Sequence, residues 1–279
     1  MIRSLIVATT LVHSVNAATV GSDHVEVVMG HKIPDTDAIC AAIGYAWELE
    51  QRGTPAKAYR LGELNPETEY VMKALDLETP PLYGDSIASG TAVSIVDTNN
   101  PDELPEGIHK AGVHSIVDHH KLSGLTSTAP LELDVRPLCS AGSILYSRAK
   151  AAGLTVPPKI AGCLLSTILS DSLEFRSPTT TELDKVHAAE LAEIAGIDLH
   201  AHAEAMLDAK AQSEFRLRFA EIPSDSPRFP QSRGDFVAVR SHIYLLCSLS
   251  DSPRVGPTPA TAVGHLSPAA IVMMDSKVL

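Results

Sequence analysis

The sequence predicts an α/β protein: a parallel β-sheet with helices on both of its faces. Three apolar runs, residues 25–29, 92–96 and 113–117, have the length and composition of short buried strands. Segments compatible with helices lie between or after these runs. Such alternation of strands and helices is typical of a parallel sheet, in which ligands bind beyond the carboxyl ends of the strands.

The first run predicts a strand, a loop and a helix in succession. Gly30 ends the β-rich run, and a polar loop follows it. Ile39, Ile43 and Ala46 then recur at helical spacing until Gly53, which predicts a helix. The next two runs end directly at Asp97 and Asp118, so each places a carboxylate at a strand end.

Two further helices are expected in the second half of the chain. Residues 160–169 form an apolar helical run that leads to Asp171. Thr179, with Glu182 three residues later, matches a capping box, and Gly196 is the expected end of that helix. We expect its apolar stripe to consist of Leu183, Val186, Leu191 and Ile194.

The chain of 279 residues suggests two domains, because one domain holds about 150 residues on average. Helical periodicity largely disappears after about residue 212, where proline and serine become frequent. Residues 237–239 and 243–249 could be strands within this region. The predicted organisation is an N-terminal extension at 1–22, a catalytic domain at 23–205, and a short or incomplete C-terminal α/β domain at 206–279.

Composition excludes some classes of protein. With 34 acidic against 22 basic residues, the net charge is −12, so nucleic acid is not an expected partner. No run of 18 or more apolar residues exists, which excludes a spanning helix on length. The four cysteines lack metal-ligand spacing and are interpreted as core thiols: Cys40, Cys139, Cys163 and Cys247.

The N-terminus leaves two interpretations open. Met1, Ile2 and Arg3 precede a short apolar run, and residues 15–17 resemble a cleavage site, which is the order found in export signals. The alternative is a disordered extension. If residues 1–17 act as a signal, the protein is exported or organellar.

Several residues at the expected strand ends can bind metal. His31, Asp35 and Asp37 lie in one tight loop with Pro34. Such imidazole and carboxylate donors suit a hard or borderline dication such as Mn²⁺. The remaining candidates come from distant parts of the chain: Asp97, Asp118, His119, His120 and Asp171.

Taken singly, an aspartate at a strand end is more often a helix cap or a turn residue than a ligand. The whole set is better explained by a dinuclear site, in which a carboxylate such as Asp97 is shared by two ions roughly 4 Å apart. Two dications would lower the pKa of a water between them and make it a nucleophile. The sequence therefore predicts a metal-dependent phosphoester or phosphoanhydride hydrolase.

The motifs resemble those of one family. Gly-His-x-x-Pro-Asp-x-Asp at 30–37, Asp97 at a strand end, Asp-His-His at 118–120 and Leu-Ser-Asp-Ser at 169–172 occur in that order. Together they resemble the manganese-dependent (family II) inorganic pyrophosphatases of the DHH phosphoesterase superfamily. The resemblance covers roughly residues 25–210, including the Glu-Leu-Ala-Glu-Ile-Ala-Gly-Ile stretch at 190–197.

The resemblance implies a role for each motif residue. His31 and Asp35 would bind one Mn²⁺, while Asp37, His119 and Asp171 would bind the other. Asp97 would bridge the two ions. Among the remaining residues, His120, Lys121 and Arg176 would contact the substrate, His120 and Asp97 would be the catalytic residues, and Asp118 would orient the histidine pair.

Three departures from the family pattern are present. Asp97-Thr98-Asn99-Asn100 stands where the family commonly has Asp-His-Asn-Glu. The family's C-terminal lysine and Ser-Arg-Lys motif have no match, since Ser232-Arg233 is followed by Gly234. The N-terminal segment is the third departure, because the family is typically cytoplasmic.

The implied function is hydrolysis of inorganic diphosphate to two phosphates by a water activated by two metal ions. Two Mn²⁺ ions are expected, with Co²⁺ or Mg²⁺ as alternatives, and Mg²⁺ would accompany the substrate. Two other interpretations remain open: another phosphoester or polyphosphate substrate, and a metal-binding protein without catalysis. A cytoplasmic location, no membrane span and a homodimer complete the expectations.

Overall fold

The computed structural model describes residues 25–220, 235–239 and 242–246, with side chains through residue 211. By its internal contacts the chain divides into two units, Met1–Phe215 and Arg216–Leu279. The first unit carries the sheet and the predicted site residues.

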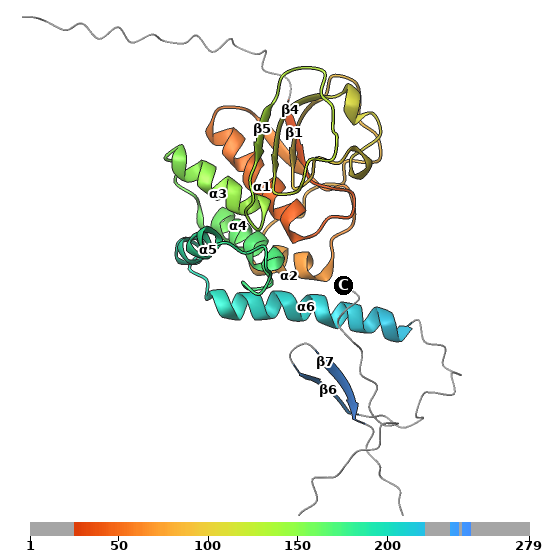
Figure 1. Ribbon diagram of the computed structural model, residues 1–279, viewed down its shortest axis with the longest axis vertical. Coiled ribbons are helices and arrows are strands. Elements are labelled where there is room, and N and C mark those ends of the chain that lie inside the picture. The colour runs from red at the N-terminus through yellow and green to blue at the C-terminus, as the bar shows by residue number, and fades with distance from the viewer. Residues whose placement is uncertain (1–24, 221–234, 240–241, 247–279) are drawn as a thin grey trace, which may run out of the picture. The chain divides into compact units, whose positions relative to one another are not determined.

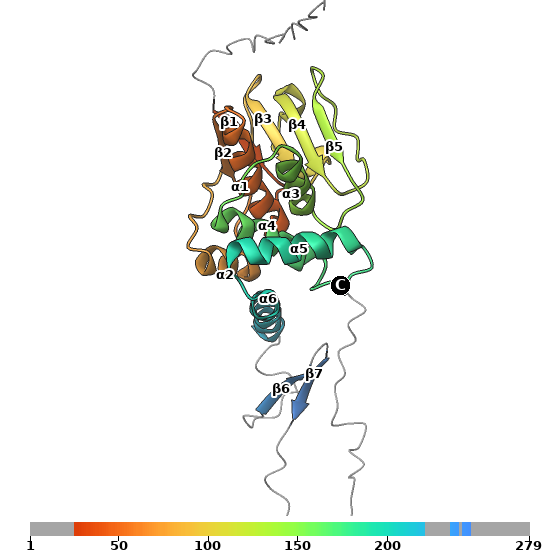
Figure 2. The same cartoon turned by 90° about the vertical axis from the view of Figure 1, so that its left-hand side faces the viewer.

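All five strands of the main sheet run parallel, in the order β2-β1-β3-β4-β5. β1 lies inside the sheet and is flanked by β2 and β3, while β5 forms one edge (Figure 2). The predicted parallel α/β fold is confirmed. The strand bounds are β1 Glu26–Met29, β2 Ala56–Tyr59, β3 Ala92–Val96, β4 Gly112–Asp118 and β5 Glu132–Val135.

Helices and short 3-10 helices connect these strands. The crossover from β3 to β4 contains the 3-10 helices η1 and η2 and no α-helix. The bounds are α1 Thr36–Gln51, α2 Pro66–Ala74, η1 Pro101–Glu103, η2 Ile108–Lys110, α3 Ala141–Ala151, α4 Pro158–Asp171, α5 Glu182–Ala195 and α6 Leu199–Ala220.

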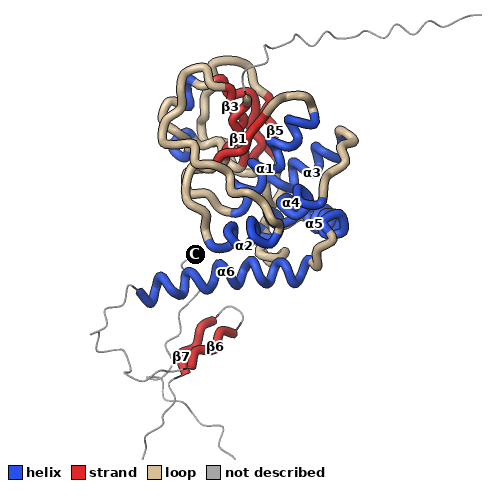
Figure 3. Tube along the Cα trace, turned by 180° about the vertical axis from the view of Figure 1, so that it is seen from behind, coloured by secondary structure: helices blue, strands red, loops and turns tan. Residues whose placement is uncertain are grey.

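Each face of the sheet packs against its own apolar cluster. On one face Val28, Val96 and Val117 pack with apolar residues of the α-helices, above all α1, α3 and α4. On the other face Ile95 and Ile116 lie in a smaller cluster with residues from η2 and the neighbouring loops. Figures 1 and 3 show the sheet between the larger helices and the short helical turns.

The α5 helix differs in detail from the prediction. Its N-cap is Thr181 and not Thr179, and the capping box is completed by Asp184 rather than Glu182. The predicted apolar stripe was also wrong: Leu191 is buried, but Leu183, Val186 and Ile194 are among the exposed hydrophobic residues. The helix buries Asp184, His187 and Ala188 instead, because its position against α4 and α3 is fixed by polar contacts at its start. Gly196 closes α5 with a left-handed φ of 67°, as expected.

Other predictions have mixed outcomes. Cys40, Cys139 and Cys163 are buried free thiols, as expected, while Cys247 lies outside the described residues. The predicted strands near the C-terminus appear as an antiparallel pair, β6 Asp235–Val239 and β7 His242–Leu246. Within the described part of the chain, no helix is both long and apolar enough to cross a membrane. The predicted signal segment at 1–17 lies outside the described residues.

Candidate metal centre

The carboxyl ends of three neighbouring strands converge on the site. His31 follows β1, Asp97 follows β3, and Asp118 is the last residue of β4. Asp97 has a left-handed backbone, with φ of 58°, while its N–H donates to Val117 O at 3.0 Å. A non-glycine residue in this conformation is strained, and such strain is often found at functional sites.

The loop that carries His31 and Asp35 passes close to the start of α1. Asp35 is the N-cap of α1 and accepts a hydrogen bond from Ala38 N–H at 3.0 Å. A Cβ added at Gly30 would lie only 2.7 Å from Ala38 Cβ, so glycine is needed where the strand meets the helix. The His31 Nε2 lies 3.7 Å from Asp35 Oδ1 and 3.4 Å from Asp97 Oδ2.

Asp37 is fully buried and is held by the N-terminus of α3. Its two carboxylate oxygens accept hydrogen bonds from Ala141 N–H at 2.6 Å and Gly142 N–H at 3.2 Å. The partial positive charge of a helix N-terminus favours an anion at this position. A Cβ on Gly142 would come within 1.9 Å of Thr167 Oγ1, so the close approach of α3 to α4 also requires glycine.

His119 lies among three carboxylates. Its Nε2 is 3.1 Å from Asp97 Oδ1, 3.5 Å from Asp171 Oδ2 and 3.7 Å from Asp37 Oδ2. Asp171 is the last residue of α4, and so it reaches the cluster from the helix layer instead of from a strand. Residues from the sheet and from the helix layer therefore meet around the His119 ring.

Potential ligand atoms form three overlapping groups, each with its atoms within 4.8 Å of one another. Asp97 belongs to all three groups. The first contains His31, Asp35 and Asp97; the second Asp37, Asp97, His119 and Asp171; the third Asp97, His119 and His120. The structure thus brings together every residue predicted to bind metal, in two sets that share one carboxylate.

The acidic residues of the cluster repel one another. Burial and the neighbouring carboxylates, Asp97 and Asp35 among them, raise the pKa of Asp37 well above its usual value. The pKa of Asp171 is likewise raised well above its usual value, by burial and by Asp37, Asp35 and Asp97. Burial alone would lower the pKa of His31, but its contacts with Asp35 and Asp97 raise it to about 10. A bound cation would relieve this repulsion between the carboxylates.

The donor set fits a divalent metal ion. Asp97 is only 2 % exposed, and its Oδ2 accepts no hydrogen bond within the described part of the chain, although His31 Nε2 lies 3.4 Å away. A buried carboxylate oxygen without a partner is costly, and a bound cation would compensate that cost. Carboxylate oxygens and neutral imidazole nitrogens are suitable ligands for Mn²⁺ and similar ions.

Asp118 holds the histidine pair in place. Its Oδ1 accepts hydrogen bonds from His119 N–H at 2.8 Å and His120 N–H at 3.1 Å, and lies 2.9 Å from His120 Nδ1. The amide of Asn99 donates to the other carboxylate oxygen and to Lys121 O. The sequence carries no local signal for Asn99, because its contacts with Asp118 and Lys121 form only in the folded chain.

The predicted substrate residues lie at the surface. The His120 side chain is 54 % exposed although its Nδ1 contacts Asp118. Lys121 is exposed in the loop that follows. Arg176 is also exposed, and its Nη1 donates to Glu174 Oε2 at 2.8 Å. Arg176 belongs to a tight turn after Asp171 in which Leu173, Glu174 and Phe175 all have positive φ.

The residues that depart from the family pattern are hydrogen-bonded to η1. Thr98 Oγ1 donates to Glu103 Oε2 at 2.6 Å and accepts from Asn100 N–H at 3.1 Å. Asn100 Nδ2 donates to Glu103 Oε1 at 3.2 Å. Glu103 O in turn accepts from Lys32 N–H at 2.9 Å, beside His31. The segment after Asp97 therefore remains anchored to the loop of His31.

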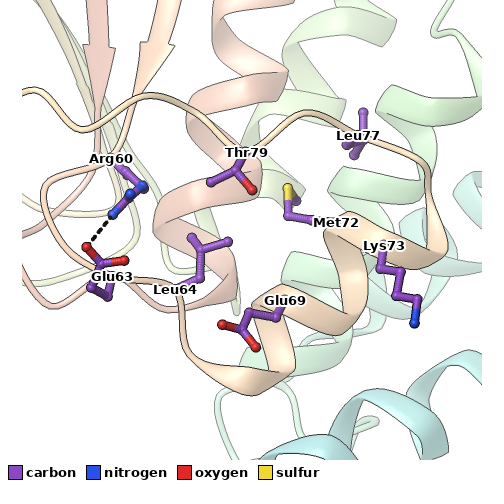
Figure 4. A pocket seen from close by; sticks show the side chains of 8 residues that line it. All are labelled: Arg60, Glu63, Leu64, Glu69, Met72, Lys73, Leu77 and Thr79. Atoms are coloured by element: carbon purple, nitrogen blue, oxygen red, sulfur yellow. Dashed lines mark ion pairs between the residues drawn. The ribbon is translucent and has the colours of Figure 1, made fainter.

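A separate hollow of about 410 Å³ lies beside α2 (Figure 4). Arg60 and Glu63 form an ion pair on one side of it, with Nη1 3.1 Å from Oε1. Glu69, Met72 and Lys73 of α2 line it further. It shares no residue with the metal-ligand groups.

Comparison with known proteins agrees with this geometry. Residues 26–168 match the model of the DHH family, N-terminal domain, so the chain belongs to the DHH family. A Deinococcus radiodurans protein named as a manganese-dependent inorganic pyrophosphatase is 44 % identical over 215 residues, covering 74 % of this chain and 68 % of its own length. A protein of the same name from Staphylococcus saprophyticus is 38 % identical over 211 residues, covering 75 % of this chain and 67 % of its own. Within the DHH family, the chain is a member of the manganese-dependent inorganic pyrophosphatases, which are hydrolases.

Solved structures show the same relationship. The crystal structure of a Methanococcus jannaschii protein assigned to the family II inorganic pyrophosphatases aligns with a TM-score of 0.61 and 35 % identity, covering 66 % of this chain and 61 % of that one. An exopolyphosphatase-related protein from Bacteroides fragilis shares the fold, with a TM-score of 0.56 at 15 % identity. The chain thus spans about two thirds of the length of its curated relatives and 61 % of the solved relative.

Proposed function

We propose that this protein hydrolyses inorganic pyrophosphate to two phosphates, with two Mn²⁺ ions held around Asp97. The observation that carries the proposal is the sharing of this one buried carboxylate by separate sets of ligand atoms. A single-ion site would not need two sets of donors on opposite sides of one aspartate. Membership of the manganese-dependent pyrophosphatases supports both the metal and the substrate.

Under this proposal, His31, Asp35 and Asp97 would hold one ion, and Asp37, Asp97, His119 and Asp171 would hold the other. Two such ions would supply an acidified water as the nucleophile and would neutralise charge on the phosphate oxygens. Mn²⁺ is the proposed ion, with Co²⁺ or Mg²⁺ as substitutes, and Mg²⁺ would enter with the substrate.

The protein's own groups orient the reactants. Asp118 fixes the His120 ring through Nδ1, which leaves the second ring nitrogen of this half-exposed side chain to contact a phosphate oxygen. Asp118 also accepts the backbone N–H groups of both histidines, so the ring of His119 is held toward Asp97. Lys121 and Arg176 are exposed cations that would bind the outer phosphate oxygens.

Phosphate release from pyrophosphate tests the proposal. The full chain loaded with MnCl₂ should release phosphate. Asp97→Asn should lower the rate roughly a thousandfold or more, because about 4 kcal/mol of transition-state stabilisation would be lost. The matched control is Asp102→Asn, which changes an exposed aspartate of η1 and should leave the rate near that of the unaltered protein. Absence of turnover by the metal-loaded unaltered chain would contradict the proposal.

The proposal also covers substrate specificity, oligomeric state and cellular location. Pyrophosphate should be cleaved faster than polyphosphate or short oligonucleotides, and the opposite order would indicate another phosphoester substrate. A homodimer and a cytoplasmic location are proposed from the family relationship. Sedimentation of the purified chain and fractionation of cells test these two points.

A further inference from the structure

Glu67 is a buried carboxylate that connects two segments carrying predicted metal ligands, the start of α1 and the end of α4. It lies in the first turn of α2 and is 0 % exposed. Its Oε2 accepts hydrogen bonds from Thr36 Oγ1 at 3.2 Å and from Ser170 Oγ at 2.9 Å. Thr36 lies between Asp35 and Asp37, and Ser170 directly precedes Asp171. One oxygen atom therefore connects the start of α1 with the end of α4.

Glu67 is not needed to cap its own helix. The N-cap of α2 is Asn65, whose side chain accepts from Thr68 N–H at 2.8 Å. Glu67 Oε1 has no hydrogen-bond partner among the described residues. Burial of a carboxylate with one unpaired oxygen costs free energy, so a purely local role at the helix start does not explain its place.

The neighbouring groups are arranged around Glu67 Oε2. Thr36 Oγ1 also lies 3.0 Å from Thr68 Oγ1, and both threonines are fully buried. Lys210 Nζ, from α6, lies 3.8 Å from Glu67 Oε2. Its charge also acts on Asp35. A cation therefore lies beside Glu67, and its charge also lowers the pKa of a ligand residue.

We propose that Glu67 is a positioning residue that sets the separation between Asp37 and Asp171, two ligands of one ion. This inference rests on the proposed function, because it assumes that these residues bind metal. Both hydroxyl partners of Glu67 are adjacent in sequence to members of the group Asp37, Asp97, His119 and Asp171. The group of His31, Asp35 and Asp97 has only Asp35 next to such a partner. Loss of Glu67 should therefore weaken one ion far more than the other.

Calorimetric titration of the metal-free full chain with MnCl₂ tests this inference without relying on activity. Glu67→Ala should weaken one of two binding steps by about 10- to 100-fold and leave the other nearly unchanged, as is usual when a residue that orients metal ligands is removed. Glu67→Gln retains an oxygen acceptor for Thr36 and Ser170 and should restore most of the affinity. Phosphate release by Glu67→Ala should recover when MnCl₂ is raised, because the ligands themselves remain.

Two controls separate positioning from general stability. Glu69→Ala removes an exposed acid from the same helix and should leave both steps unchanged. Thr36→Val and Ser170→Ala each remove one hydrogen-bond partner of Glu67 and keep its carboxylate, so they serve if Glu67→Ala does not fold. Their combined effect on the weakened step should be smaller than the sum of the single effects, since both act through one oxygen.

The outcomes are distinct. Unchanged binding by Glu67→Ala, equal weakening of both steps, or fully additive effects of Thr36→Val and Ser170→Ala would overturn the role of Glu67. If the unaltered chain shows no second binding step or no pyrophosphate cleavage, the proposed function fails instead.

Discussion

Asp97 combines burial, an unusual backbone conformation and contacts with two histidines. Its left-handed φ of 58° costs roughly 1–3 kcal/mol for a residue with a side chain. The structure maintains it because the adjacent strands are fixed on both sides of β3. The geometry places one carboxylate between His31 and His119, with Oδ2 3.4 Å from His31 Nε2 and Oδ1 3.1 Å from His119 Nε2.

Asp184 is a second carboxylate whose contacts fix the frame of the site. Its oxygens accept from Ser143 Oγ at 2.6 Å, Thr181 Oγ1 at 2.7 Å and Cys139 N–H at 3.2 Å. These contacts join the start of α5 to the segment just before α3. The first N–H groups of α3 in turn hold Asp37. Burial alone would raise the pKa of Asp184, but these hydrogen bonds lower it below its ordinary value of 3.8.

The low pKa of Asp184 predicts a pH dependence of stability. Below about pH 3.8, the Asp184 carboxylate takes up a proton more readily in the unfolded state than in the folded state. The free energy of unfolding therefore falls as the pH falls. Asp184→Asn should remove this contribution and cost roughly 1.5–3 kcal/mol at neutral pH, where hydrogen bonds to a charged group are lost. Urea unfolding between pH 3 and 7 measures both effects. Glu182→Gln, an exposed change in the same helical turn, should keep the original slope. An unchanged slope in Asp184→Asn would refute this assignment.

Local sequence pattern reveals some of these residues and not others. His31, Asp97, His119 and Asp171 were predictable because polar donors directly follow apolar runs. Glu67 and Asn99 were not, since their roles depend on hydrogen bonds to residues distant in sequence. A carboxylate on a short helix looks in sequence like any solvated acid.

At the level of elements, an ionic network ties α1, α3 and β5 together. Arg148 of α3 is 7 % exposed; it donates from Nε to Glu48 Oε1 at 3.1 Å, and its Nη1 pairs with Glu132 and Asp134. Glu48 is 1 % exposed and also contacts Arg52. The edge strand β5 is therefore joined to the helix layer by these ion pairs, and to the rest of the sheet by its backbone pairing with β4.

Replacement of Arg148 should be costly because Glu48 would remain buried with only the more exposed Arg52 as its ionic partner. Arg148→Met should lower the free energy of unfolding by about 3–5 kcal/mol, the usual effect of removing one partner of a buried pair. Arg136→Met is the matched control, since Arg136 is more exposed and pairs with Asp134, and it should cost no more than about 1 kcal/mol. Chemical denaturation of the two variants measures the difference. Equal small losses would show that the network adds little.

The elements also show where pattern reasoning fails. The helices α1 and α4 were predicted near their observed positions because their apolar residues recur at helical spacing. The start of α5 was misplaced by two residues because Thr179 and Thr181 both precede an acid three positions later. Only the tertiary contacts of Asp184 decide between these two capping boxes.

At the scale of the whole molecule, the first unit contains every predicted metal ligand. The parallel sheet places the ends of β1, β3 and β4 side by side, and α1, α3 and α4 supply the remaining contacts. The fold class was predictable from three apolar runs alone. The predicted division at residues 205 and 206 falls within α6, which continues to Ala220.

The number and spacing of bound Mn²⁺ ions test the central claim most directly. Titration of the metal-free full chain, followed by electron paramagnetic resonance, should give two ions per chain and a spectrum of magnetically coupled Mn²⁺, because two ions that share Asp97 would lie roughly 4 Å apart. Asp97→Asn should abolish the coupled signal. A single ion per chain, or two ions without coupling, would contradict a dinuclear centre built on Asp97.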